Sequence, residues 1–228
     1  MSSWVRLGFV ALLTALAVSG CGADAPEAPT GSSPAASAPA VEPAGGYDIT
    51  RIHELQNQFP PGYTVKPLPP ITLTQEQVDQ LGGLSGAMPF TFDPPHCNTM
   101  LKPVPATAGA RSEGLDAQGV EPITVIAVQS PTPARSEVGA GCDHVSVRSP
   151  GVAEGTVERI AGPDISGADT MGVRIHLNVN LKQTTRSMDR YTFVATLSPT
   201  TAVVVQGDAN ADVLQDLLTK SVAALRYQ

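Results

Sequence analysis

The residues with the most specific chemistry lie at the end of the first apolar segment. After Arg6 the chain runs from Leu7 to Val18 without a charged residue and then reaches small residues before Cys21. A basic residue, an apolar run and small residues in this order are typical of a secretory signal. A cysteine directly after Ser-Gly supplies a thiol for diacylglyceryl transfer, so the sequence Val18-Ser19-Gly20-Cys21 predicts a bacterial lipobox.

Two other interpretations of this segment are an ordinary signal peptide that contains Cys21 by chance and a retained membrane helix. The apolar run has only about a dozen residues, whereas a helix needs roughly 20 to cross a bilayer. We therefore expect residues 1–20 to be a cleaved lipoprotein signal peptide. Cys21 is then the first mature residue, acylated with chains such as palmitate, and it anchors the protein at the extracytoplasmic side of the cell membrane.

Two further cysteines are able to do redox or metal chemistry. With Cys21 lipidated, Cys97 and Cys142 remain as a pair in an exported, oxidising setting, which favours a disulfide. The bond would close a loop of roughly 45 residues and stabilise the fold by about 3–4 kcal/mol. The alternatives are free thiols or a zinc site that includes His96 and His144. Because His96 and Cys97 are adjacent, whereas zinc ligand pairs are usually two to four residues apart, we expect no metal ion.

A row of polar side chains alternates with apolar residues in the segment 171–182. The polar positions are Arg174, His176, Asn178, Asn180 and Lys182. Arginine and asparagine supply directional hydrogen-bond donors, so the row is a candidate site for an anionic or sugar ligand, with Arg186 and Arg190 nearby. The simpler interpretation, which we favour, is the solvent-facing side of an antiparallel sheet, because such faces normally carry polar residues.

The common catalytic and cofactor motifs are missing from the sequence. It has no zinc-binding histidine pair on a helix, phosphate-binding loop, dinucleotide fingerprint or calcium loop. The sequence Gly83-Leu84-Ser85-Gly86-Ala87 lacks the glycine spacing of a nucleophile elbow. The acidic turn at 164–169 lacks the alternating oxygen ligands of a calcium site. We therefore expect a non-enzymatic protein that needs no cofactor.

Periodicity and turn patterns predict the strands that hold these residues. The segment 171–182 alternates with a period of two, which indicates a long strand with one face in the core. Further strands are expected at 123–129, 144–148, 156–160, 191–197 and 202–206. Short turns such as Ser149-Pro150-Gly151 favour antiparallel pairing of neighbouring strands.

Capping patterns predict three helices. The first follows an Asp48 cap over 49–59, the second begins with the capping box Thr74-Gln75-Glu76-Gln77, and the third follows Asn210 and carries an apolar stripe that ends at Leu225. We therefore expect an α+β fold, in which helices pack on one face of an antiparallel β-sheet meander with one disulfide.

Charge and composition limit the partners and divide the chain. The formal net charge is −7 and becomes −8 when Arg6 leaves with the signal peptide. Nucleic-acid binding depends on clustered Lys and Arg, so we expect no nucleic-acid partner. Residues 22–45 contain eight alanines and five prolines and cannot form a core. We expect residues 21–46 to be a lipidated cysteine with a disordered tether, and residues 47–228 to be one globular domain.

The order of the motifs resembles a known family. The motifs are the lipobox, the Ala/Pro tether, FPPGY at Phe59 to Tyr63, PPHC at Pro94 to Cys97, GCDHVSV at Gly141 to Val147 and the closing helix. Together they resemble an uncharacterised family of mycobacterial lipoproteins, which is similar to the extracellular sensor domain of PknH-type serine/threonine kinases. The resemblance implies an antiparallel sheet flanked by helices, with a ligand-binding cleft. The kinase sensor domains carry two disulfides, whereas this chain has cysteines for one.

These observations lead to an expected function. We expect a membrane-anchored exported lipoprotein that acts as a non-enzymatic ligand-binding or sensing module of the cell envelope, with a small-molecule or envelope-derived ligand. Two alternatives are a carrier of envelope lipid or glycolipid and a structural or host-facing surface protein without a small ligand. A carrier needs an apolar cavity for acyl chains, whereas a binder of polar ligands needs a smaller cleft with convergent polar groups.

Overall fold

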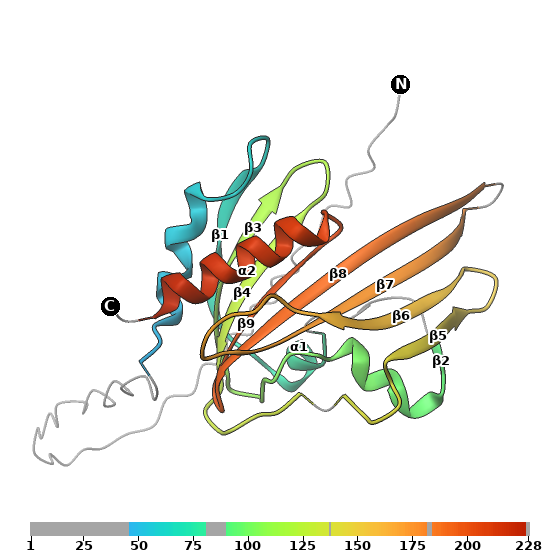
Figure 1. Cartoon of the computed structure of the whole chain (residues 1–228), viewed down its shortest axis with the longest axis horizontal. Helices are drawn as coiled ribbons and strands as arrows, with labels where there is room; N and C mark the ends of the chain where they lie inside the picture. Colours follow the sequence, from blue (N-terminus) through green and yellow to red (C-terminus); the bar gives the residue numbers. More distant parts are fainter. Residues whose placement is uncertain (1–45, 81–89, 137, 182–183, 227–228) are drawn as a thin grey trace, which may run out of the picture. The chain divides into compact units, whose positions relative to one another are not determined.

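One antiparallel sheet dominates the folded part of the chain (Figure 1). The structure, a computed structural model, describes residues 46–80, 90–136, 138–181 and 184–226. In these residues nine strands pair in the order β1-β3-β4-β9-β8-β7-β6-β5-β2. The predicted signal peptide, Cys21, the tether, the segment 83–87 and Lys182 lie outside the described residues. Within the described ranges no helix has the length and hydrophobicity to span a bilayer.

Helices and 3-10 helices, written α and η, precede, interrupt and follow the strands. In chain order the elements are η1 (Ile49–Asn57), β1 (Thr64–Thr72), α1 (Gln75–Gln80), β2 (Thr91–Asp93), η2 (Pro95–Leu101), β3 (Arg111–Gln118), β4 (Ile123–Gln129), β5 (His144–Ser149), β6 (Ala153–Ala161), β7 (Asp169–Leu181), β8 (Thr184–Ser198), β9 (Thr201–Gly207) and α2 (Ala211–Leu225).

The predicted helix caps are confirmed. The Asp48 carboxylate accepts a hydrogen bond from an amide in the first turn of η1, which is a 3-10 helix and not an α-helix. At α1, the Thr74 amide donates to Gln77 Oε1 (2.9 Å) and the Gln77 amide donates to Thr74 Oγ1 (3.3 Å). This reciprocal pair is the capping box. Asn210 accepts a hydrogen bond from a first-turn amide of α2 and so caps the last helix.

The sheet is more complex than the predicted meander. From β5 to β9 each strand pairs with the next one along the chain, as expected. However, β4 pairs with β9 and not with β5, and β2 occupies the far edge beside β5. The prediction of a simple sequential meander is therefore wrong for the sheet as a whole. β4 has the predicted bounds, 123–129, and β7 begins two residues before the predicted strand.

Periodicity does not indicate β1, β2 and β3. β1 contains Pro67, Pro69 and Pro70, and prolines are usually confined to sheet edges because they cannot donate to the ladder. β1 is an edge strand, and its register with β3 shifts between Leu68 and Ile71, where two of the prolines lie. β3 has no β-branched residue, so its sequence does not favour a strand. It is part of the sheet because it pairs with β1 and β4.

One face of the sheet, here called the α2 face, is covered by α2 and η1. α2 packs across β8 and β9, and η1 packs on β1, β3 and β4 (Figure 1). Phe193, Leu115 and Leu218 are fully buried in this layer. Glu113 is buried beneath η1, where its Oε2 lies 3.1 Å from Nε2 of His53. Apolar packing therefore makes α2 part of the core.

The opposite face, here called the disulfide face, is covered by other segments. Because side chains alternate along a strand, Val194 and Val204 point away from the α2 face, and they pack with Leu73 and Val104. Further along the same face, η2 packs on β5, β6 and β7. Helical segments therefore lie on both faces, and the prediction that helices cover only one face is not confirmed.

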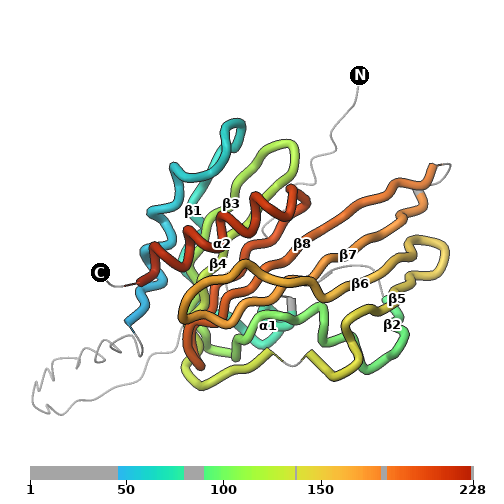
Figure 2. Tube along the Cα trace, viewed as in Figure 1, coloured from blue at the N-terminus to red at the C-terminus, as the bar shows by residue number. Residues whose placement is uncertain are grey.

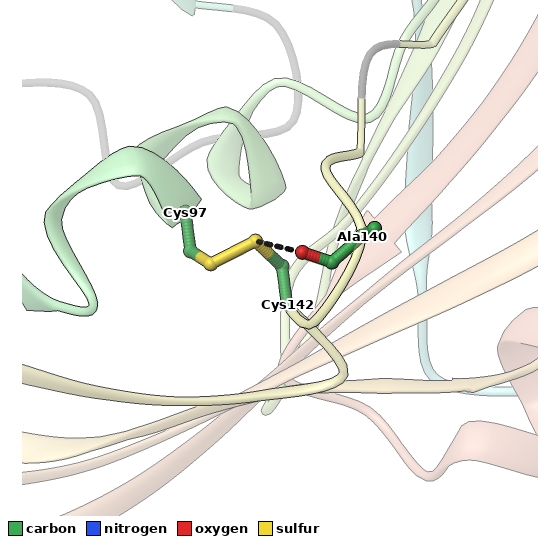
Figure 3. Close-up of a disulfide and its surroundings, with 3 residues drawn as sticks. All are labelled: Cys97, Ala140 and Cys142. Carbon is green, nitrogen blue, oxygen red and sulfur yellow. Dashed lines mark hydrogen bonds between the residues drawn. A yellow bond between two sulfur atoms is a disulfide. The ribbon is translucent and has the colours of Figure 1, made fainter.

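The disulfide joins η2 to the turn before β5 (Figure 3). Cys97 and Cys142 are bonded, in agreement with the predicted pair, and their Cα atoms are 5.4 Å apart. Both cysteines are essentially inaccessible to solvent, and the Ala140 carbonyl oxygen lies 4.0 Å from Sγ of Cys142. Because the bond closes a loop with a sequence separation of 45, it restricts the unfolded chain as well as bracing β5.

β6 and β7 approach each other closely at Gly155. Gly155 pairs with Leu177, and a Cβ atom built on Gly155 would lie 1.8 Å from the carbonyl oxygen of His176. A real Cβ atom does not come so near to a backbone oxygen, so a side chain at this position would push the strands apart. Glycine therefore permits the β6–β7 pairing beside the polar row of β7.

We predict that Gly155→Ala lowers the free energy of unfolding by about 2–3 kcal/mol, because the added methyl group must displace the backbone of β7. Denaturant unfolding of the full chain measures this change. Ser146→Ala, on an exposed position of β5, serves as the control and should alter stability by less than about 0.5 kcal/mol. Equal stability of the Gly155→Ala variant and the wild type would contradict the close approach.

Candidate ligand-binding face

The predicted polar row lies on the α2 face, one strand beyond the helix. Arg174, His176, Asn178 and Asn180 share this face of β7, because they alternate with the residues that β7 buries on the disulfide face. α2 packs on β8 and β9, and β9 pairs with β8 only from Tyr191 onward. The β7–β8 hairpin therefore projects past the end of β9 (Figure 2), and the row lies on this partly exposed region.

Strand pairing arranges the polar side chains of this region in three parallel rungs, since directly opposite residues of antiparallel strands lie on the same face. The Arg174 rung consists of His144, Glu158, Arg174 and Tyr191. The His176 rung consists of Asp93, Ser146, Thr156, His176 and Asp189. The Asn178 rung consists of Thr91, Arg148, Glu154, Asn178 and Ser187.

Arg174 is held by carboxylates on both neighbouring strands. Its Nε and Nη2 donate to Oδ1 of Asp189 at 3.0 and 2.9 Å. Its Nη1 lies 3.9 Å from Oε2 of Glu158, whose other oxygen is 3.2 Å from Nδ1 of His144. The hydrogen bond to the Asp189 carboxylate raises the pKa of the Arg174 guanidinium. The charge of Arg174 is therefore already compensated within the sheet.

The arginines near the row do not add positive charge to this face. The register places Arg186 opposite Val179 and Arg190 opposite Ile175, so both belong to the other side of the sheet. Arg190 Nη1 also donates to Oδ1 of Asp208 at 3.3 Å. The row is consequently not the basic strip that its sequence suggests.

His176 lies between an acid and a hydroxyl on β8. Its Nδ1 is 3.0 Å from Oδ1 of Asp189, and its Nε2 is 3.4 Å from Oγ of Ser187. Partial burial alone would raise the pKa of the Asp189 carboxyl, but the hydrogen bonds from His176 and Arg174 outweigh this effect and hold that pKa below its ordinary value. Because an ionised carboxylate only accepts hydrogen bonds, Nδ1 of His176 donates to Asp189.

A hollow of about 490 Å³ lies over the His176 and Asn178 rungs. Its polar lining comes from β2, β5, β6 and β7 and consists of Thr91, Asp93, Ser146, Arg148, Glu154, Thr156, His176 and Asn178. Gly155 also borders it, where β6 approaches β7. Of the predicted row, the structure thus brings His176 and Asn178 to the hollow, whereas Arg174 and Asn180 are not among its lining residues.

A second hollow, of about 530 Å³, borders β8. Glu121, Ser187, Asp189 and Asp208 are among its lining residues, together with Val120, whose side chain is fully exposed. Arg186 also lines this hollow, so three carboxylates there face one guanidinium. The paired side chains of β7 and β8 lie between the two hollows, and of these two hollows only the first also contains an amide side chain, that of Asn178.

A search of the sequence for long periodic strands does not identify most of the residues that line the first hollow. Ser146 and Arg148 alternate with buried valines on β5, and Glu154 and Thr156 do so less regularly on β6. The alternation of β5 carries the same signal as that of β7, but it is short. Asp93 reaches the site from β2, which has only three residues, and no local pattern indicates it.

The predicted alternative of a zinc site does not assemble. His96 has a ring nitrogen within 4.8 Å of both cysteine sulfurs, but those sulfurs are bonded to each other. His144 points to the α2 face and interacts with Glu158, on the side of the sheet opposite to the disulfide. The four ligands considered from the sequence therefore do not converge.

Ser187, His176 and Asp189 have the connectivity of a nucleophilic triad. However, the Asp189 side chain is 36% exposed and shares the same oxygen with Arg174. A triad depends on preorganised charges in a site from which water is excluded. Water and the guanidinium both weaken the field of Asp189 on His176, so we interpret the three residues as an interstrand hydrogen-bond network.

We predict that a fluorophosphonate probe labels the full chain no faster than it labels the Ser187→Ala variant, because the Ser187 hydroxyl is not activated. Intact-mass spectrometry over time measures the labelling. Labelling at Ser187 that disappears in His176→Gln would contradict this prediction and would assign a catalytic nucleophile.

Comparisons with known proteins establish the fold and the family. The chain is similar to an uncharacterized protein (Rv0999 ortholog) from Mycobacterium smegmatis, known from an X-ray structure, with 21% identity, a TM-score of 0.65 and coverage of 80% of this chain and 98% of that chain. At this identity the similarity shows the fold alone. No functionally curated protein matches the chain. The sequence profile of DUF5642, a domain of unknown function, matches residues 48–226, so the chain belongs to the DUF5642 family.

Proposed function

We propose that the protein is an exported lipoprotein, anchored at the extracytoplasmic side of the cell membrane, that binds a polar ligand on the rungs of the α2 face. It acts as a non-enzymatic ligand-binding or sensing module of the cell envelope. The observation that carries this proposal is the hollow of about 490 Å³, into which polar side chains from four strands converge. Its volume lies in the range of roughly 300–1,000 Å³ that is usual for small-molecule sites.

The export and anchoring parts of the proposal rest on the N-terminal sequence and the cysteines. The lipobox that ends at Cys21 supplies the thiol for lipidation, and the Ala/Pro-rich tether supplies a spacer between the membrane and the domain. A buried disulfide fits an oxidising compartment. The resemblance to the extracellular sensor domain of PknH-type kinases supports a sensing role.

The polarity of the hollow favours this function over a lipid or glycolipid carrier. Asp93, Arg148 and Glu154 line the hollow, and an acyl chain placed there would remove water from these charged groups without replacing its hydrogen bonds. Burial of unpaired polar groups costs roughly 2–7 kcal/mol each, and burial of charges costs more. A polar ligand avoids this cost because its own groups replace the water.

We predict that Cys21→Ala abolishes incorporation of an alkyne-tagged palmitate and releases the protein from the membrane fraction, because no other attachment is expected. Labelling in the native host or in a related bacterium, followed by fractionation, measures both effects. Ser19→Ala keeps a small residue before the cysteine and serves as the control. A Cys21→Ala protein that remains in the membrane fraction would contradict the lipid anchor.

The binding function is tested by native mass spectrometry of the full chain purified from its own envelope. We expect a non-covalent adduct in the wild type. Thr156→Trp, in the middle of the His176 rung, fills the hollow and should remove the adduct, whereas Thr185→Trp, on the same face near the hairpin tip, should retain it. Absence of any adduct, or its retention in Thr156→Trp, would overturn the proposed site and favour a surface protein without a ligand there.

A further inference from the structure

We propose that the hollow binds a neutral, hydroxyl-rich ligand, a saccharide or polyol, laid across the strands along the His176 and Asn178 rungs. This inference rests on the proposed function, because it names the chemical class of ligand for the same site. It also decides between the anionic ligand and the sugar ligand that the polar row of β7 suggests from the sequence.

Acceptors and donors are interspersed along both rungs. Asp93 and Glu154 offer carboxylate oxygens that only accept hydrogen bonds, whereas Arg148 only donates. Asn178 donates and accepts, and so do the hydroxyls of Ser146 and Thr156, whereas the Thr91 hydroxyl donates to the sheet and can only accept from a ligand. A sugar hydroxyl also donates and accepts, so adjacent hydroxyls of one ring can meet adjacent acceptors and donors of this surface.

The charges in the hollow disfavour an anionic ligand. Among the described residues that line the hollow, two are carboxylates, Asp93 and Glu154, and Arg148 is the one arginine or lysine. Arg174, the arginine of the predicted polar row, is engaged by Asp189 and Glu158. The net charge of the chain, −7, adds a repulsive long-range field. An anion would therefore meet two carboxylates, with only the Arg148 guanidinium to compensate.

A cationic ligand is disfavoured by the arrangement of the same residues. Arg148 lies directly opposite Glu154 across β5 and β6, so a cation that approaches Glu154 also approaches the Arg148 guanidinium. Asp93 is in the next rung, and His176 stands at the β7 end of that rung. The lining contains two carboxylates and one guanidinium, so its formal charge is −1 when histidine is counted as neutral. This near balance of charge suits a neutral polar ligand.

The dimensions of the surface fit an extended molecule. The His176 and Asn178 rungs cross five strands from β2 to β8, and strand spacing makes this distance about 19 Å. The two rungs are two residues apart along each strand, or about 7 Å. The hollow is bordered by sheet on one side and is accessible from the solvent side, so a short oligosaccharide fits better than a compact molecule that needs an enclosing cavity.

The floor of this site is held in place without the ligand. The Thr91 hydroxyl donates to the Arg148 carbonyl oxygen at 3.0 Å and fastens the edge strand β2 to β5. At the other end, the Asp189 network fixes the ring of His176. Since the strands pair in a fixed register, the lining groups keep their spacing in the free protein, which reduces the entropy cost of binding.

The experiment screens the full chain in detergent for binding to an array of neutral oligosaccharides, with inorganic phosphate and oleate as the anionic and acyl-chain probes. Isothermal titration calorimetry then measures the best saccharide against three variants. Asn178→Ala should weaken binding by about tenfold, since it leaves ligand hydroxyls without their partners. Asn180→Ala, on the same face of β7 but outside the hollow, is the matched control and should change binding by less than about twofold.

Glu154→Gln separates the classes of ligand by the sign of its effect. A neutral saccharide loses a charge-assisted hydrogen bond, so its binding should weaken by about threefold to tenfold. An anion loses a repulsive neighbour, so its binding should become tighter. Saccharide binding that weakens in Asn178→Ala and Glu154→Gln supports the inference.

Two results would overturn the inference but leave the proposed function intact. One is preferential binding of phosphate that Thr156→Trp blocks. The other is the absence of saccharide binding together with a native adduct of another polar class that Thr156→Trp removes. Preferential binding of oleate that Thr156→Trp blocks would overturn the proposed function as well and would favour a lipid carrier. If no probe binds and no native adduct is found, the inference and the proposed function both fail.

Discussion

The register of β7 between β6 and β8 is the constraint on which the remaining structure depends. It places His176 opposite Asp189 on the α2 face and buries Ile175 and Leu177 on the disulfide face. A shift by one residue would turn every side chain of β7 to the other face. Arg174 would then enter the core without its carboxylates, and burial of an unpaired charge is very costly. The strict alternation of β7 thus excludes the shifted pairing.

Local patterns predict most of the helices and strands that the structure describes, but they predict the candidate site poorly. The capping box at Thr74 and the alternation of β7 depend on neighbours in the sequence, so both are readable without a structure. The partner of Arg174 is Asp189, across a hairpin, and the opposite end of the His176 rung is Asp93 on a three-residue strand. The neutralisation of the row and the lining of the hollow are therefore consequences of register, which periodicity alone does not specify.

The number of layers changes across the sheet, and this change leaves the proposed binding face uncovered. β9 is buried on both sides, because α2 covers one side and the segment around Leu73 and Val104 covers the other. Its sequence is correspondingly apolar at consecutive positions, as is usual for strands covered on both faces. On β7, from Val173 onward, apolar residues are confined to the disulfide face, so a second covering layer would have no apolar surface to bury. The hydrophobic effect thus ends the α2 layer at β8, and the next strands are free to present polar groups.

The disulfide packs on the disulfide face of β5, β6 and β7, the strands whose other face is exposed. Cys97 and Cys142 pack with Val145, Val157 and Ile175, whose neighbours along each strand point to the α2 face. Strands with a single covered face bury less apolar area than strands in a three-layer region, so they receive less hydrophobic stabilisation. A covalent bond offsets part of this deficit, since it limits the unfolded ensemble without adding a layer over the rungs. The polar groups of the rungs therefore remain exposed on the α2 face, and the sheet still holds them at fixed spacing.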